Sequence, residues 1–395
     1  MKVLLVSASV SSRLQNSLYE RYGVSTGFAI QKYYRLLEEG LLLNGAEVEE
    51  LSIVPIKKAD APFTFKRFKN ETEGGVRHRY LSYLKYAVIY HPLVVIALFF
   101  KVLFWGLRHR RDSVIICDIL IPSVCIGTAY GAALAGCKRI AWVTDMPGIA
   151  TSGGGSFESM GLMGRMQVKA ISGFSGFIFS TRQANAKLNP GGKPYVVIEG
   201  FVPSGSMLPK DSATSGEKVI MYAGGLREEY GVGALCEAFM KLKDMDDIRL
   251  VLYGNGAFTS KVKEYMAEDH RIEFRGTATN SEIVRAEKEA TLLVNPRFTG
   301  AEYTLYSYPS KNIEYMVSGT PMVTTRLAGI PEDHFPYIFL FDDESVDGYA
   351  ATLRTILSKQ GEELKDFGRK AAEYIISTRS SEVQVRKILD LASRL

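Results

Sequence analysis

A short segment near residue 310 combines residue types that can hold a phosphorylated ligand. Pro309 stands where a loop passes into a predicted helix, so the first turn of that helix presents free N–H groups to an anion. Lys311 adds a positive charge in that turn. Glu314 lies one turn further on nearly the same face, where its carboxylate can accept hydrogen bonds from a diol such as a ribose. Phosphate donors beside a carboxylate predict a nucleotide-diphosphate site.

Glycine-containing turns after three predicted strands could bring backbone amides close to the same kind of ligand. They are Gly224-Gly225, Gly254-Asn255-Gly256 and Gly276-Thr277. Glycine leaves room for a phosphate or a base to approach the chain, yet it also ends strands for purely structural reasons. The turns therefore support a ligand site only together with the segment around Lys311.

Several other kinds of site lack their sequence signatures. The chain has no GxGxxG after its first apolar strand, no GxxxxGK[ST] and no GxSxG, which removes the main support for dehydrogenases, P-loop proteins and α/β-hydrolases. The five histidines show no metal-ligand spacing, and Asp244-Met245-Asp246 is typical of a solvated turn. We expect no metal and no other cofactor.

The elements that must position these residues alternate between short apolar strands and helices. A chain of 395 residues is too long for one ordinary core, and its composition turns to Ser, Gly, Pro and Lys near residue 203. We therefore predict two doubly wound α/β domains, 1–200 and 217–370, with a linker 201–216 and a C-terminal helix 371–395. Ligands of such sheets bind beyond the carboxyl ends of the strands.

One basic segment accounts for the charge of the chain. Residues 66–111 hold ten lysines and arginines against two glutamates, so this segment carries +8 while the whole chain carries +5. The remainder is slightly acidic, and binding of nucleic acid is not expected. A long helix is predicted over 76–111, and its apolar stretch 86–107 is long enough to span a bilayer.

Three placements of that apolar stretch stay open: a buried helix, a spanning helix and an interfacial helix. Lys101 interrupts the stretch, His91-Pro92 breaks its start, and basic clusters flank both ends, which disfavours spanning. Aromatic residues interleaved with Lys and Arg favour an anionic membrane surface. We therefore expect the protein to bind such a surface through 76–111.

Other features favour a reducing compartment. The apolar run Val3–Val6 is too short for an export signal and is typical of a buried first strand. The four cysteines have no CxxC spacing and lie in apolar surroundings. Thr151–Ser156, which is rich in glycine, is predicted to be a flexible loop. We expect a cytoplasmic protein, peripheral on the inner face of the cell membrane.

The segment around Lys311 resembles the donor-binding segment of family 4 of the retaining glycosyltransferases, of group 1 type, which have the GT-B fold. The similar stretches are Pro309-Ser310-Lys311, Glu314-Tyr315-Met316 and 319–323. The resemblance covers nearly the whole chain. Residues 225–239, 249–254 and 274–276 are similar to elements of the family's C-domain, and 143–147 to an N-domain strand end that faces the cleft.

This resemblance implies a fold, an activity and site residues. It implies two Rossmann-like domains facing across a cleft, a nucleotide-sugar donor in the C-domain, an acceptor in the N-domain, no essential metal, and a C-terminal helix packing back on the N-domain. Glu314 matches the second glutamate of the family's Glu-x7-Glu pattern, which binds the ribose. The first glutamate falls on Tyr306, and Glu302 on the same loop is the candidate to replace it.

The basic pair that the family uses in its first C-domain loop falls on Gly225 and Tyr230, and the family's N-domain histidine is not evident. Without a metal, basic side chains and helix N-termini must stabilise the charge of the departing diphosphate. Arg227, Arg297 and Lys311 are therefore the candidates for that role.

Asp145 is the candidate to orient the acceptor, against the alternative that it caps the next helix. With Arg227 and Lys311 it makes up the predicted catalytic set. The predicted donor-binding set is Gly224, Gly225, Gly254, Asn255, Gly256, Gly276, Thr277, Arg297, Glu302, Tyr306, Ser307, Tyr308, Pro309, Ser310 and Glu314.

The sequence leaves three functions open. The first is transfer of a sugar from a UDP- or GDP-sugar to a glycan, lipid-linked, in the synthesis of cell-surface polysaccharide. The second is a nucleotide-sugar epimerase of the same fold, which would need a carboxylate and histidine set that we do not find. The third is a non-catalytic scaffold at the membrane surface with a degenerate donor site. The nucleotide, the sugar, the acceptor and the oligomeric state do not follow from the sequence.

Overall fold

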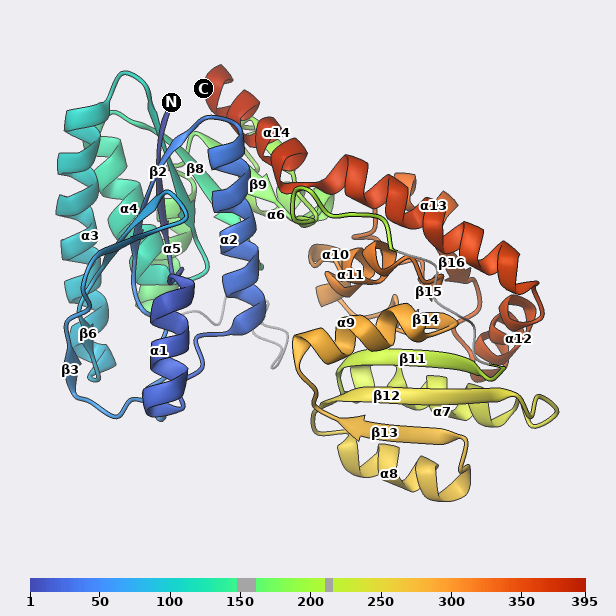
Figure 1. Cartoon of the computed structure of the whole chain (residues 1–395). Coiled ribbons are helices and arrows are strands. Elements are labelled where there is room, and N and C mark those ends of the chain that lie inside the picture. The colour runs from blue at the N-terminus through green and yellow to red at the C-terminus, as the bar shows by residue number, and fades with distance from the viewer. Residues whose placement is uncertain (148–160, 210–215) are drawn as a thin grey trace. The chain divides into compact units, whose positions relative to one another are not determined.

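The computed structural model describes residues 1–147, 161–209 and 216–395, which form two compact units (Figure 1). The N-terminal unit comprises residues 1–204 and 380–395, and the C-terminal unit comprises residues 205–379. Each unit has a central sheet that is parallel or nearly so, which confirms the predicted α/β class. The predicted loop 151–156 lies outside the described residues.

The N-terminal unit is an eight-stranded sheet with helices on both faces. Its strands are β1 (Lys2–Ser7), β2 (Glu47–Ser52), β4 (Glu71–Glu73), β5 (Val76–Tyr80), β7 (Ser113–Asp118), β8 (Lys138–Val143), β9 (Gly176–Phe179) and β10 (Tyr195–Val197). Their order is β10-β9-β8-β7-β1-β2-β5-β4, and only β4 with β5 pairs antiparallel. A separate small sheet pairs β3 (Phe65–Lys66) with β6 (Tyr83–Leu84).

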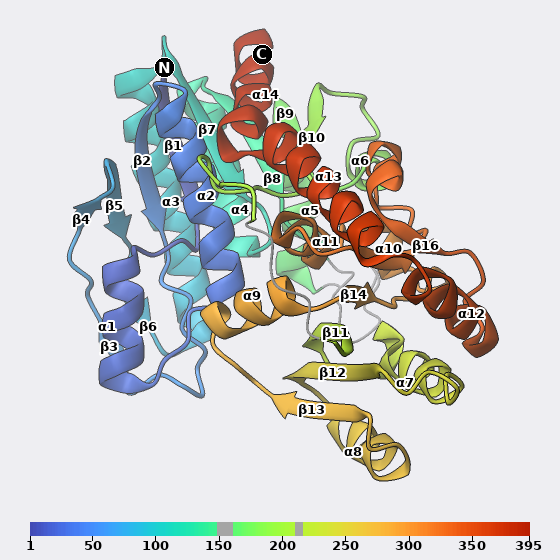
Figure 2. The ribbon, with the colours of Figure 1, turned by 45° about the vertical axis from the view of Figure 1, so that its right-hand side comes forward.

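Helices cover the two faces of this sheet in two groups. They are α1 (Ser12–Tyr22), α2 (Phe28–Leu43), α3 (Ala87–His109), α4 (Pro122–Ala135), α5 (Leu162–Ile171), α6 (Arg182–Leu188) and α14 (Ser381–Arg394). α2 and α14 pack together over the core that contains Val3, Leu5 and Ile116. α3 and α4 lie side by side on the opposite face (Figures 1 and 2). All six residues of β7 are buried because both faces are covered.

The prediction of one long helix over 76–111 was wrong for the first residues of that range. Val76–Tyr80 is β5, in which buried and more exposed residues alternate as a strand requires. The helix α3 begins only at Ala87. Pro92 lies inside α3 and does not break its start, although a proline ring leaves the carbonyl of Val88 without its helical N–H partner. Val88 is 89% exposed, so that carbonyl can be solvated.

α3 is long and apolar enough to cross a membrane by length and composition. However, β5 precedes it and β7 follows it, and both strands belong to one sheet. A spanning helix would place its two ends about 30 Å apart on opposite sides of a bilayer, which a single sheet cannot accommodate. The structure therefore removes the spanning placement.

Small residues on α4 let the backbone of α3 approach closely. A Cβ atom added at Gly127 would lie 2.7 Å from the carbonyl oxygen of Val95, and one at Gly131 would lie 2.5 Å from that of Phe99. These contacts are shorter than a carbon atom tolerates, so the two glycines set the distance between the helices. One face of α3 is consequently held firmly in the N-terminal unit.

Replacing Gly131 with leucine should push α3 away from α4 and lower the free energy of unfolding by at least 1–3 kcal/mol, roughly the cost of overpacking a core. Ala133→Leu is the matched control, because Ala133 lies on the exposed side of the same helix. Urea denaturation measures both variants. Equal stability of the two would show that the close approach of the helices is not required.

The C-terminal unit has a six-stranded, wholly parallel sheet. Its strands are β11 (Lys218–Gly225), β12 (Ile248–Asn255), β13 (Ile272–Gly276), β14 (Leu292–Asn295), β15 (Met322–Thr325) and β16 (Phe339–Phe341). Their order is β13-β12-β11-β14-β15-β16. The helical elements are η2 (Glu228–Tyr230), α7 (Val232–Met240), α8 (Thr259–Glu268), α9 (Asn280–Glu289), α10 (Tyr303–Tyr306), α11 (Lys311–Ser318), η3 (Glu332–Tyr337), α12 (Val346–Leu357) and α13 (Gly361–Arg379).

The limits of the two units differ from those predicted. The expected boundary at 370 falls inside α13, a continuous helix that packs on α11 and η3, and the division lies after Arg379. The predicted linker 201–216 is not wholly a linker, because Val202 forms a β-bridge with Ser380 inside the N-terminal unit. All four cysteines are buried and free, as their apolar surroundings indicated.

Candidate functional site

The candidate site lies in the C-terminal unit, where the order of its sheet reverses. The chain builds outward from β11 through β12 to β13, then returns to add β14 on the other side of β11. In such sheets the helices after β11 and β14 leave on opposite faces, so a crevice opens beyond the carboxyl ends of these two strands. Those ends are Gly225 and Asn295.

Buried hydrogen bonds fix α11 beside the two strand ends. The side-chain amide of Asn295 donates to Oδ1 of Asn312 at 2.7 Å, and the backbone N–H of Ala223 donates to the hydroxyl of Tyr315 at 2.9 Å. Asn312 and Tyr315 are fully buried. No side chain caps the start of α11, and the N–H of Asn312 donates to the carbonyl oxygen of Pro309 at 2.8 Å. The anion site predicted from Pro309 would therefore use the other N–H groups of the first turn.

Lys311 and Glu314 are paired in the first turn of α11. The Lys311 ammonium lies 2.8 Å from a carboxylate oxygen of Glu314 and 3.9 Å from one of Glu287. The side chains of Lys311 and Glu314 are each about one third exposed, while Glu287 is buried. A phosphate would compete with Glu314 for Lys311, and a diol would compete with Lys311 for Glu314. Lys311 can therefore bind the diphosphate of a nucleotide while Glu314 binds its ribose.

Arg297 follows β14 closely and is held by an aromatic ring. Its guanidinium carbon lies 4.6 Å from the centroid of the Tyr230 ring. Within the ranges that the structure describes, Arg297 forms no ion pair with a carboxylate. A guanidinium stacked on a ring and not neutralised by a carboxylate can bind a phosphate with two parallel hydrogen bonds.

Arg227 is less available than Arg297. Its guanidinium lies 3.2 Å from the carboxylate of Glu229 and 6.0 Å from the Tyr230 ring centroid. The guanidinium groups of Arg227 and Arg297 thus both lie over the ring of Tyr230. In the family that this segment resembles, a basic residue occupies the position of Tyr230. A Cβ atom at Gly225 would lie 3.1 Å from the same ring. The ring fills the space in which a larger side chain at 225 would stand.

Packing within the protein by itself explains why glycines occupy the turns after β11 and β12. Gly254 has a φ of 139°, and a Cβ atom there would overlap the carbonyl oxygen of Gly224. One at Gly256 would overlap the carbonyl oxygen of Leu226. The backbone N–H of Leu226 also donates a hydrogen bond to the backbone carbonyl oxygen of Asn255. These glycines let the ends of β11 and β12 pass each other, whether or not a phosphate lies beside them.

The remaining predicted donor-binding residues are spread over α10, its flanks and the edge of the sheet. Glu302 is exposed and precedes α10, which ends at Tyr306, and Ser307 follows. Tyr308 is buried, and its hydroxyl lies 3.3 Å from Nδ1 of His334, whose pKa is lowered to about 4 by burial. Gly276 and Thr277 stand at the end of the edge strand β13, which β12 separates from β11.

Asp145 lies in the N-terminal unit, just beyond β8. Its Oδ1 accepts the N–H of Met146 at 3.0 Å, and burial raises the pKa of its carboxyl group. It does not cap α5, whose N-cap is Gly161. The adjacent Thr144 donates its hydroxyl to Asp118 at 3.2 Å. Asp145 therefore stands at the carboxyl ends of β7 and β8, a position open to a ligand role.

The sequence of the C-terminal unit matches a known family model. Residues 217–359 match the model described as glycosyl transferases group 1. The C-terminal unit is therefore similar in sequence to the domain that this model describes. The matched range contains every predicted donor-binding residue. No curated protein sequence matches the chain significantly.

Solved structures support the GT-B fold for the whole chain. Sucrose-phosphate synthase from Thermosynechococcus elongatus is 15% identical with a TM-score of 0.67, covering 100% of this chain and 98% of that one. HepE of Anabaena in complex with UDP is 14% identical with a TM-score of 0.66, and both chains are covered completely. The lipopolysaccharide outer core galactosyltransferase WaaB is 15% identical, with a TM-score of 0.63 and complete coverage of both chains.

The N-terminal unit also holds buried carboxylates that sequence reasoning missed. The hydroxyl of Tyr34 donates to Asp118 at 2.5 Å, that of Ser7 donates to Glu50 at 2.7 Å, and that of Ser9 donates to Glu38 at 3.2 Å. Burial raises the pKa of all three carboxyls, that of Glu38 to about 7.

Only one of these carboxylates has a clear sequence signal. Asp118 directly follows the apolar run 114–117, where a carboxylate is unusual. Glu50 lies in β2, where acidic and apolar residues alternate, a pattern that is typical of a strand with one exposed face. It is buried because both faces of β2 are covered near its carboxyl end.

Proposed function

We propose that this glycosyltransferase moves a sugar from a UDP-sugar to a lipid-linked glycan in cell-surface polysaccharide synthesis. The reaction proceeds without a metal and retains the configuration of the sugar. The protein works in the cytoplasm, peripheral on the inner face of the cell membrane. The observation that carries this proposal is the site at the ends of β11 and β14, inside the range that matches the group 1 model. Arg297 follows β14 there, and Lys311 and Glu314 lie in the first turn of α11.

The residues of the site have distinct roles in the proposed reaction. Glu314 accepts the ribose hydroxyls, while the first N–H groups of α11 and Lys311 hold the diphosphate. As the bond between the sugar and the diphosphate breaks, negative charge builds on the departing oxygen, and Arg297 stabilises that charge. Because this cation stands in the site before reaction, the cost of orienting solvent around the new charge is avoided. Asp145 orients the acceptor in the N-terminal unit.

The choice of UDP rests on a relative of the same fold. HepE has been solved with UDP and with UDP-glucose. At 14% identity this likeness shows the fold alone, so the nucleotide is part of the proposal.

The proposed location rests on the outer face of α3. Its apolar residues recur at helical spacing and are 49–64% exposed, whereas its inner face packs on α4. This outer row, called the α3 stripe below, consists of Ile89, Leu93, Ile96, Phe100, Phe104 and Leu107. A row of large apolar side chains in a basic segment fits an anionic membrane surface.

A thermal-shift experiment tests the donor. UDP should raise the melting temperature more than GDP or ADP, and the shift should be the same with and without Mg²⁺. Glu314→Ala should remove most of the shift, because the ribose loses its carboxylate partner. Glu362→Ala should retain it, since Glu362 forms the same kind of i,i+3 pair, with Lys365 at 3.5 Å, on the exposed face of α13.

Two outcomes of that experiment, and two outcomes of a product assay with the nucleotide sugar, would contradict the proposal. The absence of a shift with every nucleotide would exclude a donor site, and a shift that requires Mg²⁺ would exclude the metal-free mechanism. Stabilisation by UDP with no product on any acceptor would favour the scaffold, and conversion of the nucleotide sugar without an acceptor would favour the epimerase.

A further inference from the structure

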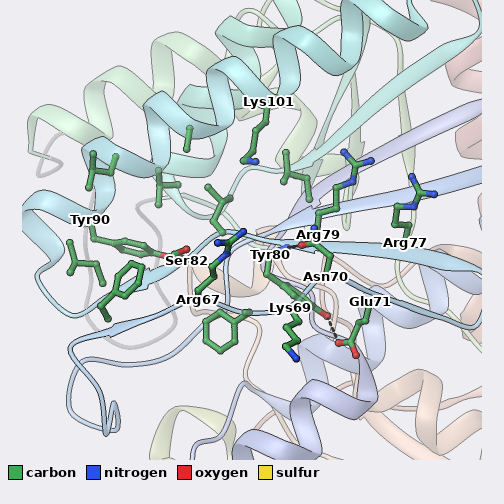
Figure 3. A pocket seen from close by; sticks show the side chains of 18 of the residues that line it. Arg67, Lys69, Asn70, Glu71, Arg77, Arg79, Tyr80, Ser82, Tyr90 and Lys101 are labelled. Carbon is green, nitrogen blue, oxygen red and sulfur yellow. Dashed lines mark hydrogen bonds between the residues drawn. The ribbon is translucent and has the colours of Figure 1, made fainter.

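A large groove runs between α3 and the edge of the N-terminal sheet. Its volume is about 1330 Å³. Tyr90, Leu93 and Ala97 line it from α3, the segment 65–72 forms the opposite wall, and β5 with its following loop forms the floor (Figure 3). Pockets for small ligands have volumes of roughly 300–1,000 Å³, so this groove has room for a larger, extended molecule.

Cationic side chains from three elements converge on this groove. They are Arg67, Lys69, Arg77, Arg79 and Lys101. Figure 3 shows Lys101 reaching down from α3 into the hollow that Arg67 and Arg79 border. Five cations on one groove repel each other unless an anion or a carboxylate lies among them.

Protein carboxylates neutralise little of this charge. Arg79 pairs with Glu49 at 3.0 Å. Glu71 is the acid that lines the groove, and its carboxylate already accepts the hydroxyls of Tyr80, at 3.1 Å, and of Ser11, at 2.5 Å. Within the described parts of the chain, the other four cations of the groove form no ion pair. The groove therefore keeps a net positive charge after Glu49 and Glu71 are taken into account.

The α3 stripe meets this groove at Leu93. Leu93 belongs to both, since it lines the groove and is 51% exposed on the stripe. Lys101 is two helical turns from Leu93 and follows Ala97 by one turn, so the cation stands on the groove side of the stripe. A cationic hollow next to an apolar ridge matches the two parts of a lipid, whose phosphate is anionic and whose chains are apolar.

We propose that this groove binds the phosphate headgroup of an anionic membrane lipid, with the lipid's acyl chains lying along the α3 stripe. The proposal deepens the membrane location given under the proposed function, because it replaces a diffuse attraction between charges by one defined site. A lipid held there would fix the depth and rotation of the N-terminal unit at the membrane. The occupant is a lipid and not a free phosphate, because acyl chains can cover the exposed apolar side chains of the α3 stripe and a phosphate cannot.

Vesicle flotation with paired charge variants tests this site. The full-length protein should float with vesicles of phosphatidylcholine containing phosphatidylglycerol and stay behind with phosphatidylcholine alone. Arg67→Gln with Lys101→Gln removes two charges from the groove and should lower the affinity for the anionic vesicles at least tenfold. Arg108→Gln with Arg111→Gln removes the same number of charges from the exposed end of α3, outside the groove, and should lower it no more than about threefold.

The outcomes separate this site from the alternatives. Equal losses in the two double variants would mean diffuse attraction and would overturn the groove. Binding of inorganic phosphate to the groove as tightly as binding of the anionic vesicles would mean that the lipid chains contribute nothing, which also overturns the proposal. The thermal shift with UDP, measured on the same variants, reports the donor site separately and confirms that they are folded. Loss of the UDP shift in the wild type would therefore contradict the proposed function and leave the lipid result standing.

Discussion

Replacing Arg297 with alanine is expected to lower the rate of sugar transfer by about two orders of magnitude, with a much smaller change in KM for the donor. The reason is that negative charge on the diphosphate grows as the sugar departs, so a cation beside it stabilises the transition state more than the bound donor. Removal of one such group from an active site commonly costs about 10²–10³ in rate. Steady-state kinetics with the UDP-sugar and a lipid-linked acceptor measure both constants.

The C-terminal unit contains a matched control for this variant. Arg326 stacks on the ring of Phe335 with the same 4.6 Å separation that Arg297 has from Tyr230, and it pairs with Asp342 at 3.6 Å. Arg326→Ala removes a stacked guanidinium outside the candidate site and should leave kcat unchanged. If both alanine variants lose rate equally, the loss is structural and Arg297 has no role in the chemistry. Arg297→Lys should recover part of the rate because it keeps the charge.

Replacing Glu38 with glutamine is expected to stabilise the N-terminal unit above neutral pH and to have little effect near pH 5. Burial raises the pKa of Glu38 to about 7, in spite of Arg35 nearby, while an unfolded glutamate titrates near about 4.3. The folded state thus binds more protons between these two values, so stability falls as the pH rises through this window. Above pH 7 the buried charge costs on the order of 3 kcal/mol, which glutamine avoids.

Urea denaturation of the wild type and the variant at pH 5 and pH 8 measures this difference. Glu20→Gln is the control, since Glu20 is exposed on α1 in the same unit. A gain that is equal at both pH values would show that Glu38 does not titrate in this window. Glu50 lies in the same buried group and its pKa is also raised, so the double variant should gain less than the sum of the two single changes.

Local patterns were sufficient for the C-terminal unit. Four of its six strands end in glycine or asparagine, and its donor segment is a continuous stretch from Pro309 to Glu314. A parallel strand buried on both faces is apolar throughout, and a helix start carries its own signals, so neighbouring residues determine both features. The family match over 217–359 agrees with what these patterns indicated.

The structure of the N-terminal unit was harder to predict, because it depends on contacts between residues that are far apart in the sequence. The prediction included the alternating segment 76–80 in the helix that follows it. This segment is a strand because it pairs with β2. The sequence likewise left the apolar stretch 86–107 as core, interfacial or spanning. The close packing of α3 on glycines of α4 holds one face of the helix and leaves the other face exposed, which fits neither a spanning helix nor a fully buried one.

The sequence by itself determined the fold class, the donor segment and the basic segment, because each of these depends on residues that are close together along the chain. Only the tertiary structure gathered Glu38, Glu50 and Asp118 into one buried group, and only it placed Arg67 and Lys101 on the same groove. The physical reason is that burial and charge depend on neighbours in space. In this chain those neighbours are brought together by the pairing of strands and by the close packing of α3 on α4.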